Sequence, residues 1–190
     1  GLPWIPPELR DLPGAVALAA EGRLPRLIED RDIRGILHVH SSWSDGRLGI
    51  EAIVRRSSGL GYQYVGITDH SRSARYARGL SVEALRQQQL QIDAAQAGTP
   101  GIRVLKGSEV DILPDGSLDY PDEVLAGLDF VVASIHSAFG LKEADQTARV
   151  VRALRHPRTT ILGHPTGRLL LAREPYAIDL DRVLQVAAEE

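Results

Sequence analysis

From residue 33 onward, apolar segments typical of buried strands alternate with segments of helical periodicity. A buried parallel strand reads as a continuous apolar run, and a crossover helix must precede the next parallel strand. The strand-like segments lie at residues 33–39, 62–68, 102–113, 130–135 and 159–163, and the helix-like segments at 48–61, 81–97, 143–156 and 178–190. This order predicts an α/β fold of parallel βα units, barrel-like rather than open if the candidate site residues converge.

The composition narrows the classes of function. The net charge is −3, so the basic surface of a stand-alone nucleic-acid binder is absent; a small charged substrate, or a nucleic-acid end delivered by another domain, remains open. No glycine-rich dinucleotide fingerprint follows the first strand, and no phosphate-loop motif occurs. No apolar stretch is long enough for a membrane span, and no Cys is present, so a reducing, cytoplasmic location is expected. A metal would need His nitrogen and carboxylate oxygen, which suit zinc, manganese or iron.

Five of the six histidines follow predicted strands. They are His38 and His40 after the first strand, His70 after the second, His136 after the fourth and His164 after the fifth. The third strand instead carries Glu109 and Asp111. Because the C-terminal ends of parallel strands meet at one face of the fold, we expect these side chains to converge. Histidine is the commonest metal ligand, so the sequence predicts a metal site at this face.

The spacing of these residues favours more than one ion. Alternate residues of a strand share a face, so His38 and His40 point inward together, and Ile36 lies on the same face one layer deeper. Glu109 lies deepest among the acids and is the best bridge between ions. The set exceeds the needs of one ion, which predicts two or three. Such clusters activate water and bind both sides of a phosphoryl group during in-line displacement.

The ordered motifs "LHVH", "SDG", "ITDH", "GSEVDI", "SIH" and "GHP" resemble those of the PHP (polymerase and histidinol phosphatase) superfamily. Longer segments, among them "GLPWIPPELR" and "ILGHPTGRLL", resemble the C-terminal PHP domain of bacterial and archaeal family X DNA polymerases. The resemblance implies a distorted (β/α)7 barrel with up to three ions, usually manganese or zinc. It implies phosphoester hydrolysis, and in these DNA-directed DNA polymerases a metal-dependent 3′-5′ exonuclease acting on DNA.

The resemblance also implies a role for individual residues. The implied metal ligands are His38, His40, Asp45, His70, Glu109, His136 and His164. His38 and His40 would bind one ion with Glu109, which would bridge to a second ion held by His136 and His164. Asp45 and His70 would hold the third ion. Glu109, His38 and His136 are the expected catalytic residues.

Two departures from the family pattern concern the site. Ile36 stands where the first motif usually has Asp, and losing an acid behind a ligand His typically costs roughly 10- to 100-fold in affinity. We therefore expect weakened metal binding that Ile36→Asp strengthens. The final Asp-x-His pair of the family is absent, so the chain is expected to be a fragment lacking the last strand or strands. Residues 1–32 are expected to lead in from the polymerase core, and residues 33–190 to form the PHP domain.

Arginines near the site are candidates for substrate binding. Arg168, in "GHPTGR", can hold a phosphate through two hydrogen bonds, or can form a surface salt bridge. Arg72, Arg75 and Arg78 lie with Tyr76 in a loop after the second strand. That loop can hold a DNA backbone and stack a base, or it can be solvated without a ligand.

Three other residues are expected to lie outside the ligand set. Asp69 faces away from the neighbouring ligand His and is expected to support the site or cap a helix. Asp111 is expected to have a structural or supporting role. Lys106 lies on the opposite face of its strand from Glu109, so we expect it to lie away from the site.

Three functional hypotheses remain at this stage. The first is a 3′-5′ exonuclease module of a repair polymerase, acting on a DNA 3′ end that the polymerase core delivers. The second is a small-molecule phosphatase, of which a histidinol-phosphate phosphatase is an example. The third is a non-catalytic metal-binding module of the polymerase. The sequence leaves the identity of the metal and the oligomeric state open.

Overall fold

The computed structural model describes residues 3–190 and contains two compact units, divided after Ile33. The first unit contains three short helical segments: η1 (Pro7–Leu9), α1 (Ala15–Ala20) and η2 (Asp30–Asp32). Its buried apolar side chains, within residues 3–33, are Leu9, Ala15 and Ala19. That this segment leads in from a polymerase core stays a prediction.

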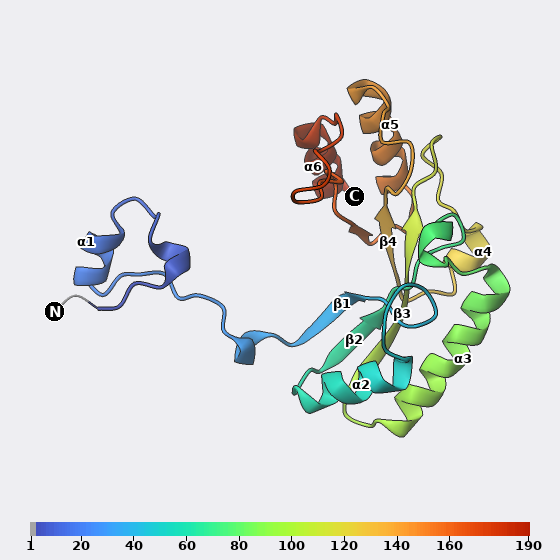
Figure 1. Ribbon diagram of the computed structural model, residues 1–190, viewed down its shortest axis with the longest axis horizontal. Coiled ribbons are helices and arrows are strands. Elements are labelled where there is room, and N and C mark those ends of the chain that lie inside the picture. Colours follow the sequence, from blue (N-terminus) through green and yellow to red (C-terminus); the bar gives the residue numbers. More distant parts are fainter. Residues whose placement is uncertain (1–2) are drawn as a thin grey trace. The chain divides into compact units, whose positions relative to one another are not determined.

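The second unit, Arg34–Glu190, holds a five-stranded parallel sheet in the order β1-β2-β3-β4-β5. The strands are β1 (Gly35–Val39), β2 (Tyr64–Ile67), β3 (Arg103–Asp111), β4 (Phe130–Ser134) and β5 (Ile161–Leu162). The helical segments are α2 (Ile50–Gly59), η3 (Arg75–Ala77), α3 (Val82–Gly98), α4 (Asp122–Leu125), α5 (Glu143–Leu154) and α6 (Leu180–Glu189) (Figure 1). Each strand pairs with the next one in sequence, so right-handed crossovers place their helices on one face of the sheet. Sequential strand order with the helices on one face is typical of a βα barrel.

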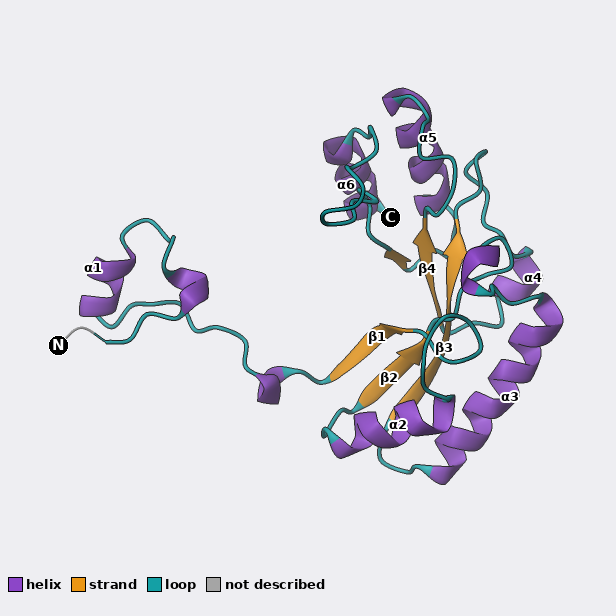
Figure 2. Ribbon diagram, in the orientation of Figure 1, coloured by secondary structure: helices purple, strands orange, loops and turns teal. Residues whose placement is uncertain are grey.

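The sheet bends at β3. The first half of β3, from Arg103 to Lys106, pairs with β2, whereas the second half, from Gly107 to Asp111, pairs with β4. The two halves of the sheet therefore take different directions, and Figure 2 shows β1 and β2 lying at a steep angle to β4. The result is a curled half-barrel of five parallel strands, which confirms the predicted α/β, barrel-like fold class.

Two apolar clusters fill the space between the sheet and its helices. In the first, Val65 of β2 and Val104 of β3 pack with Ile53 of α2 and Ile92 of α3. The second covers the other half of the sheet and includes side chains of β3, β4, α5 and α6, namely Val110, Val131, Val150 and Val183. Because the apolar side chains are on the helix side, the alternate residues face the concave side, where polar groups gather at the strand ends.

The predicted elements agree with the structure, apart from short helices. Ser81 caps α3 as expected, because its hydroxyl accepts a hydrogen bond from the Ala84 amide at 3.2 Å. The four-residue helix α4 was not predicted, since a single turn offers too little periodicity to recognise. Within residues 3–190, no helix combines the length and apolar character that crossing a bilayer requires.

Two glycines make room for Phe130 on the concave face. A Cβ added to Gly66 would lie 2.5 Å from the Phe130 ring, and one added to Gly107 would also lie 2.5 Å from it. The buried ring therefore covers both backbones, one from β2 and one from β3. Glycine at these positions fixes how closely the aromatic ring approaches the sheet below the site.

We predict that Gly66→Ala destabilises the fold by about 1–3 kcal/mol, because the added methyl overpacks a filled position. The matched control is Gly59→Ala in α2, where an added Cβ meets nothing within 4 Å. That change should leave the free energy of unfolding unchanged or raise it by about 0.5 kcal/mol. Urea unfolding followed by circular dichroism measures both. Equal stability of the two variants would contradict the close packing of Phe130.

Candidate metal centre

Glu109, near the end of β3, lies at the centre of the polar cluster. Its side chain is buried, at 1% exposure, and contacts all five strand-end histidines. Its Oε2 atom lies 3.3 Å from His38 Nε2, 3.4 Å from His40 Nε2 and 3.1 Å from His70 Nδ1. One carboxylate oxygen thus joins residues at the ends of β1 and β2.

The other oxygen of Glu109 faces the second half of the sheet. Oε1 lies 3.3 Å from His136 Nε2 and 2.9 Å from His164 Nε2. The second ring nitrogen of His136 lies 2.7 Å from Asp111 Oδ1, one inward position further along β3. Asp111 therefore fixes the ring orientation of His136, in line with its expected supporting role.

Asp45 closes the cluster from the loop after β1. Its Oδ1 lies 3.2 Å from His40 Nδ1, and its Oδ2 lies 3.6 Å from His70 Nε2. His40 and His70 thus each lie between two carboxylates, Asp45 on one side and Glu109 on the other. The structure brings together all seven residues that the sequence pointed to, from four strand ends, the third strand and the loop after β1.

The electrostatics of the cluster favour an ionised Glu109. Burial raises the pKa of this carboxyl, but hydrogen bonds with His136, His164 and His38 outweigh burial and hold the pKa far below its ordinary value. For His136, burial lowers the pKa, yet hydrogen bonds with Asp111 and Glu109 raise it to about 9. For His70, burial dominates over the attraction of Glu109, and the pKa is lowered.

The donor set fits divalent metal ions. His40, His70 and His136 each present both ring nitrogens to carboxylates, but a neutral imidazole has only one N–H to donate. Charging all three rings would place imidazolium ions side by side, with ring centroids 4.5 Å apart for His40 and His70 and 4.9 Å for His70 and His136. A cation between nitrogen and carboxylate oxygen satisfies both partners without this repulsion.

Unpartnered atoms support the same conclusion. Within residues 3–190, His40 Nδ1 and His70 Nδ1 are buried and make no hydrogen bond. Three groups have ligand atoms within 4.8 Å of one another: His38, His40 and Glu109; His40, Asp45 and His70; and His70, Glu109 and His136. The first group matches a predicted ligand set. The second group adds His40 to the predicted pair of Asp45 and His70, and the third adds His70 to Glu109 and His136. The sequence did not indicate these two additions. The assignment of each residue to an ion stays a prediction.

Asp69 organises the loop that carries Asp45. Its buried carboxylate accepts hydrogen bonds from the amide and hydroxyl of Ser41, at 2.7 and 2.5 Å, and from the amide and hydroxyl of Ser44, at 3.3 and 2.5 Å. Gln88 of α3 adds a fifth, at 2.7 Å. Asp69 therefore fixes the turn and, through it, the position of Asp45. The sequence placed Asp69 outside the ligand set but gave no sign of these partners, which lie 19 to 28 residues away.

Asp119 organises a second loop, between β2 and α3. Its buried carboxylate accepts hydrogen bonds from the Ser73 amide at 2.7 Å, the Ser73 hydroxyl at 2.6 Å and Arg72 Nε at 3.0 Å. Burial raises the pKa of Asp119, but these hydrogen bonds outweigh burial and lower it. Arg72, a candidate for substrate binding, is thus held by Asp119 while half of its side chain is exposed. Its contact with a substrate stays a prediction.

In the loop after β5, Arg173 has defined side-chain contacts, whereas the candidate Arg168 has none within residues 3–190. Arg168 is exposed, and its side chain makes no hydrogen bond or ion pair within residues 3–190, so its role as a phosphate ligand stays a prediction. Arg173 instead lies over the Phe139 ring, 4.1 Å from its centroid, and donates to the Gly167 carbonyl at 2.8 Å. The sequence gave no sign of this contact.

Tyr76 lies at the rim of the cluster. Its ring centroid is 5.9 Å from that of His70 and 6.0 Å from that of His136. Burial on its inner side, followed by the charges of Asp111, Glu109 and Asp45, raises the pKa of its hydroxyl to about 12. The Tyr76 hydroxyl is therefore a hydrogen-bond donor at neutral pH.

Ile36 lies in an irregular part of β1. The register of β1 against β2 shifts between Ile36, which pairs with Val65, and Val39, which pairs with Ile67. The pairing with β2 is therefore irregular in this part of the strand, whereas exposure still alternates along β1, with Ile36 and His38 both exposed. Ile36 is 38% exposed. That Ile36 lies behind His38, and that Ile36→Asp strengthens metal binding, stay predictions.

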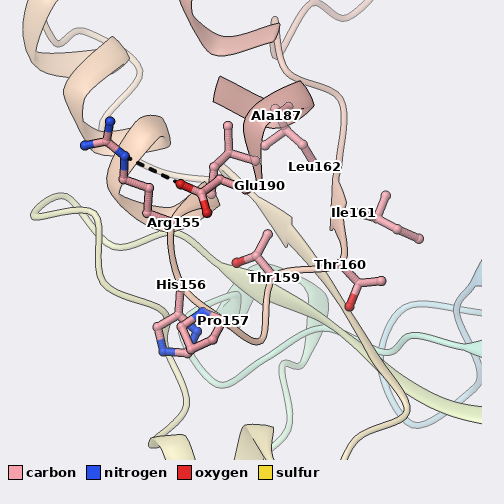
Figure 3. A pocket seen from close by; sticks show the side chains of 10 residues that line it. Arg155, His156, Pro157, Thr159, Thr160, Ile161, Leu162, Ala187 and Glu190 are labelled. Carbon is pink, nitrogen blue, oxygen red and sulfur yellow. Dashed lines mark ion pairs between the residues drawn. The ribbon is translucent and has the colours of Figure 1, made fainter. Parts of the chain in front are cut away.

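Two further groups lie away from the cluster. Lys106 pairs with Asp93 of α3 at 2.6 Å, on the helix side, as its strand position predicted. A pocket of about 220 Å³ lies at the amino end of β5 and is lined by Arg155, His156 and Thr160, among others (Figure 3). Parallel α/β barrels carry their chemistry at the opposite, carboxyl ends of the strands. This pocket contains none of the candidate ligands.

Comparison with known proteins identifies the family. The PHP domain profile matches residues 37–169. The chain belongs to the PHP domain family. It is 46% identical, over 98% of its length, to the DNA polymerase/3′-5′ exonuclease PolX of Bacillus subtilis (strain 168), and covers 32% of that protein. It is 30% identical to a probable phosphatase of Thermoanaerobacter sp. (strain X514), over 68% of this chain and 56% of the relative.

The chain therefore spans about a third of the first PHP relative and just over half of the second. Among solved structures, the chain resembles histidinol phosphate phosphatase from Lactococcus lactis, crystallised with zinc, L-histidinol and phosphate, at 15% identity and a TM-score of 0.48. That match covers 71% of this chain and 59% of the other.

We predict that Glu109→Gln weakens divalent metal binding by more than about 100-fold, because it removes the charge that contacts every histidine of the site; a merely supporting acid typically contributes about 10- to 100-fold. Elemental analysis and isothermal titration calorimetry with Mn²⁺ and Zn²⁺ measure the effect. The matched control is Glu51→Gln, an exposed residue paired with Arg55 on α2. Unchanged stoichiometry and affinity in Glu109→Gln would show that the cluster does not hold the ions.

Proposed function

We propose that the chain is the 3′-5′ exonuclease module of a family X DNA polymerase and hydrolyses phosphodiesters at a DNA 3′ end during repair. The observation that carries the proposal is the Glu109-centred cluster of five histidines and Asp45. Membership of the PHP family and this cluster support the coarser assignment, a metal-dependent phosphoesterase. The similarity to PolX over nearly the whole chain favours DNA as the substrate.

The residues of the cluster fit the needs of phosphoester hydrolysis. When bound, manganese or zinc ions supply an activated water and positive charge against the phosphoryl oxygens. Glu109 holds the two halves of the ligand set together, because each of its oxygens faces a different group of histidines. Asp111 keeps the His136 ring oriented, and Asp69 keeps the loop of Asp45 in place. His38, His136 and Glu109 are therefore the residues we expect to matter most for the reaction.

Arginine side chains near the cluster support an anionic substrate. Arg72 is fixed by Asp119, and Arg173 is fixed over Phe139, in the loops that follow β2 and β5. A fixed guanidinium loses little side-chain entropy when it binds a phosphate oxygen. Because the net charge of the protein is −3, these arginines attract phosphate groups only locally. Delivery of the DNA end by a polymerase core is therefore part of the proposal.

Two alternatives have support of their own. The similarity to a probable phosphatase favours a small-molecule phosphatase that hydrolyses phosphomonoesters. Ile36, in place of the usual Asp, favours a non-catalytic metal-binding module. A phosphatase would hydrolyse phosphomonoesters, and a non-catalytic module would hydrolyse neither substrate. A single set of assays therefore separates both alternatives from an exonuclease.

The test is a 5′-labelled single-stranded oligonucleotide incubated with the protein and Mn²⁺. We expect stepwise shortening from the 3′ end, abolished by a chelator and reduced by more than about 100-fold in Glu109→Ala. The Glu51→Ala variant should retain full activity, since Glu51 lies exposed on α2.

Parallel assays decide between the alternatives. Hydrolysis of p-nitrophenyl phosphate without shortening of DNA would favour the phosphatase. Bound metal without either activity would favour the non-catalytic module. Shortening that persists in Glu109→Ala would overturn the assignment of the activity to this cluster.

A further inference from the structure

The loop between β2 and α3, residues 71–80, is fixed at both ends. At its start, Ser73 and Arg72 are bound by the buried carboxylate of Asp119. At its end, the Leu80 amide donates to the His70 carbonyl at 2.9 Å, and the buried Tyr120 hydroxyl donates to the Leu80 carbonyl at 2.7 Å. The loop is therefore an ordered part of the site.

The middle of the same loop is also held. Ala74 and Ala77 are buried on either side of Tyr76, and Arg78 donates to the Ser44 carbonyl in the loop that carries Asp45. These contacts define the position of the short helical turn η3, from which Tyr76 projects. Its backbone position is thus set by buried neighbours and by the adjacent loop.

Although its backbone is fixed, the Tyr76 side chain is 69% exposed. It belongs to neither apolar cluster, and its hydroxyl makes no hydrogen bond within residues 3–190. Its ring nevertheless approaches His70 and His136, with centroids about 6 Å away. An exposed aromatic ring in this place adds little to the stability of the fold. A ligand bound at the cluster could instead pack against the ring.

We propose that Tyr76 contacts the substrate and stacks against the base of the nucleotide whose phosphate lies at the Glu109 cluster. The inference rests on the proposed nucleic-acid substrate and deepens it. Aromatic side chains stack on every base because each base has a π-face, and such stacking is tolerant of sequence. A compact phosphomonoester without a base gains nothing from the ring, so Tyr76 selects nucleotides over small phosphates.

The experiment measures binding separately from cleavage. The probe is a 5′-fluorescein single-stranded oligonucleotide with phosphorothioate linkages at its 3′ end, titrated with Mn²⁺-loaded protein and followed by fluorescence anisotropy. Tyr76→Ala should raise Kd by about 5- to 150-fold, the range typical of losing one base stack. Tyr76→Phe keeps the ring and should stay within about twofold of the unchanged protein. Leu90→Ala, an exposed apolar residue on α3, is the surface control.

A second oligonucleotide, lacking the 3′-terminal base, tests the contact itself. It should bind the unchanged protein and Tyr76→Ala equally well, because the stacking partner is absent. An equal loss with both oligonucleotides, no loss with either, or a loss of bound Mn²⁺ in Tyr76→Ala would overturn the inference. Binding of this probe, together with no shortening of the unmodified 5′-labelled oligonucleotide by the unchanged protein, would overturn the proposed exonuclease and leave the stacking inference to be judged on Kd. No oligonucleotide binding at all would overturn the inference.

Discussion

The buried carboxylate of Glu109, surrounded by five imidazoles, is the interaction on which the remaining site geometry depends. An ionised carboxylate in a protein interior costs several kcal/mol unless positive charge or hydrogen-bond donors surround it. The histidines can supply donors, but His40, His70 and His136 have carboxylates at both ring nitrogens and only one N–H each when neutral. Divalent cations resolve this conflict, which is why the arrangement fits a metal centre better than a network of hydrogen bonds alone.

The curled sheet makes this convergence possible. Because β3 pairs with β2 along its first half and with β4 along its second, Glu109 reaches residues on both sides of the bend. Asp69 and Asp119 then hold the loops after β1 and β2 by accepting hydrogen bonds from serine hydroxyls and amides. Through these loops, the two aspartates set where Asp45, Arg72 and Tyr76 lie.

The fold class and the converging residues were predictable from the sequence because both follow from local patterns. Strand ends in a parallel fold share one face, so the five histidines and Glu109 could be placed together before any coordinates were known. Contacts between distant loops were not predictable, because nothing near Asp69 indicates Ser41, Ser44 or Gln88 as partners. The irregularity of β1 against β2 was not predictable either, because it has no signature in the alternation of residues.

We propose that Glu109 joins two or more metal ions within one ligand cluster. Anomalous X-ray diffraction from crystals soaked in Mn²⁺, recorded on both sides of the manganese absorption edge, tests it most directly. The account predicts at least two anomalous peaks that share the Glu109 carboxylate, with ring nitrogens of His40 and His70 among the ligands. Peaks confined to other parts of the chain, a single peak, or several peaks that do not share Glu109 as a ligand would contradict it.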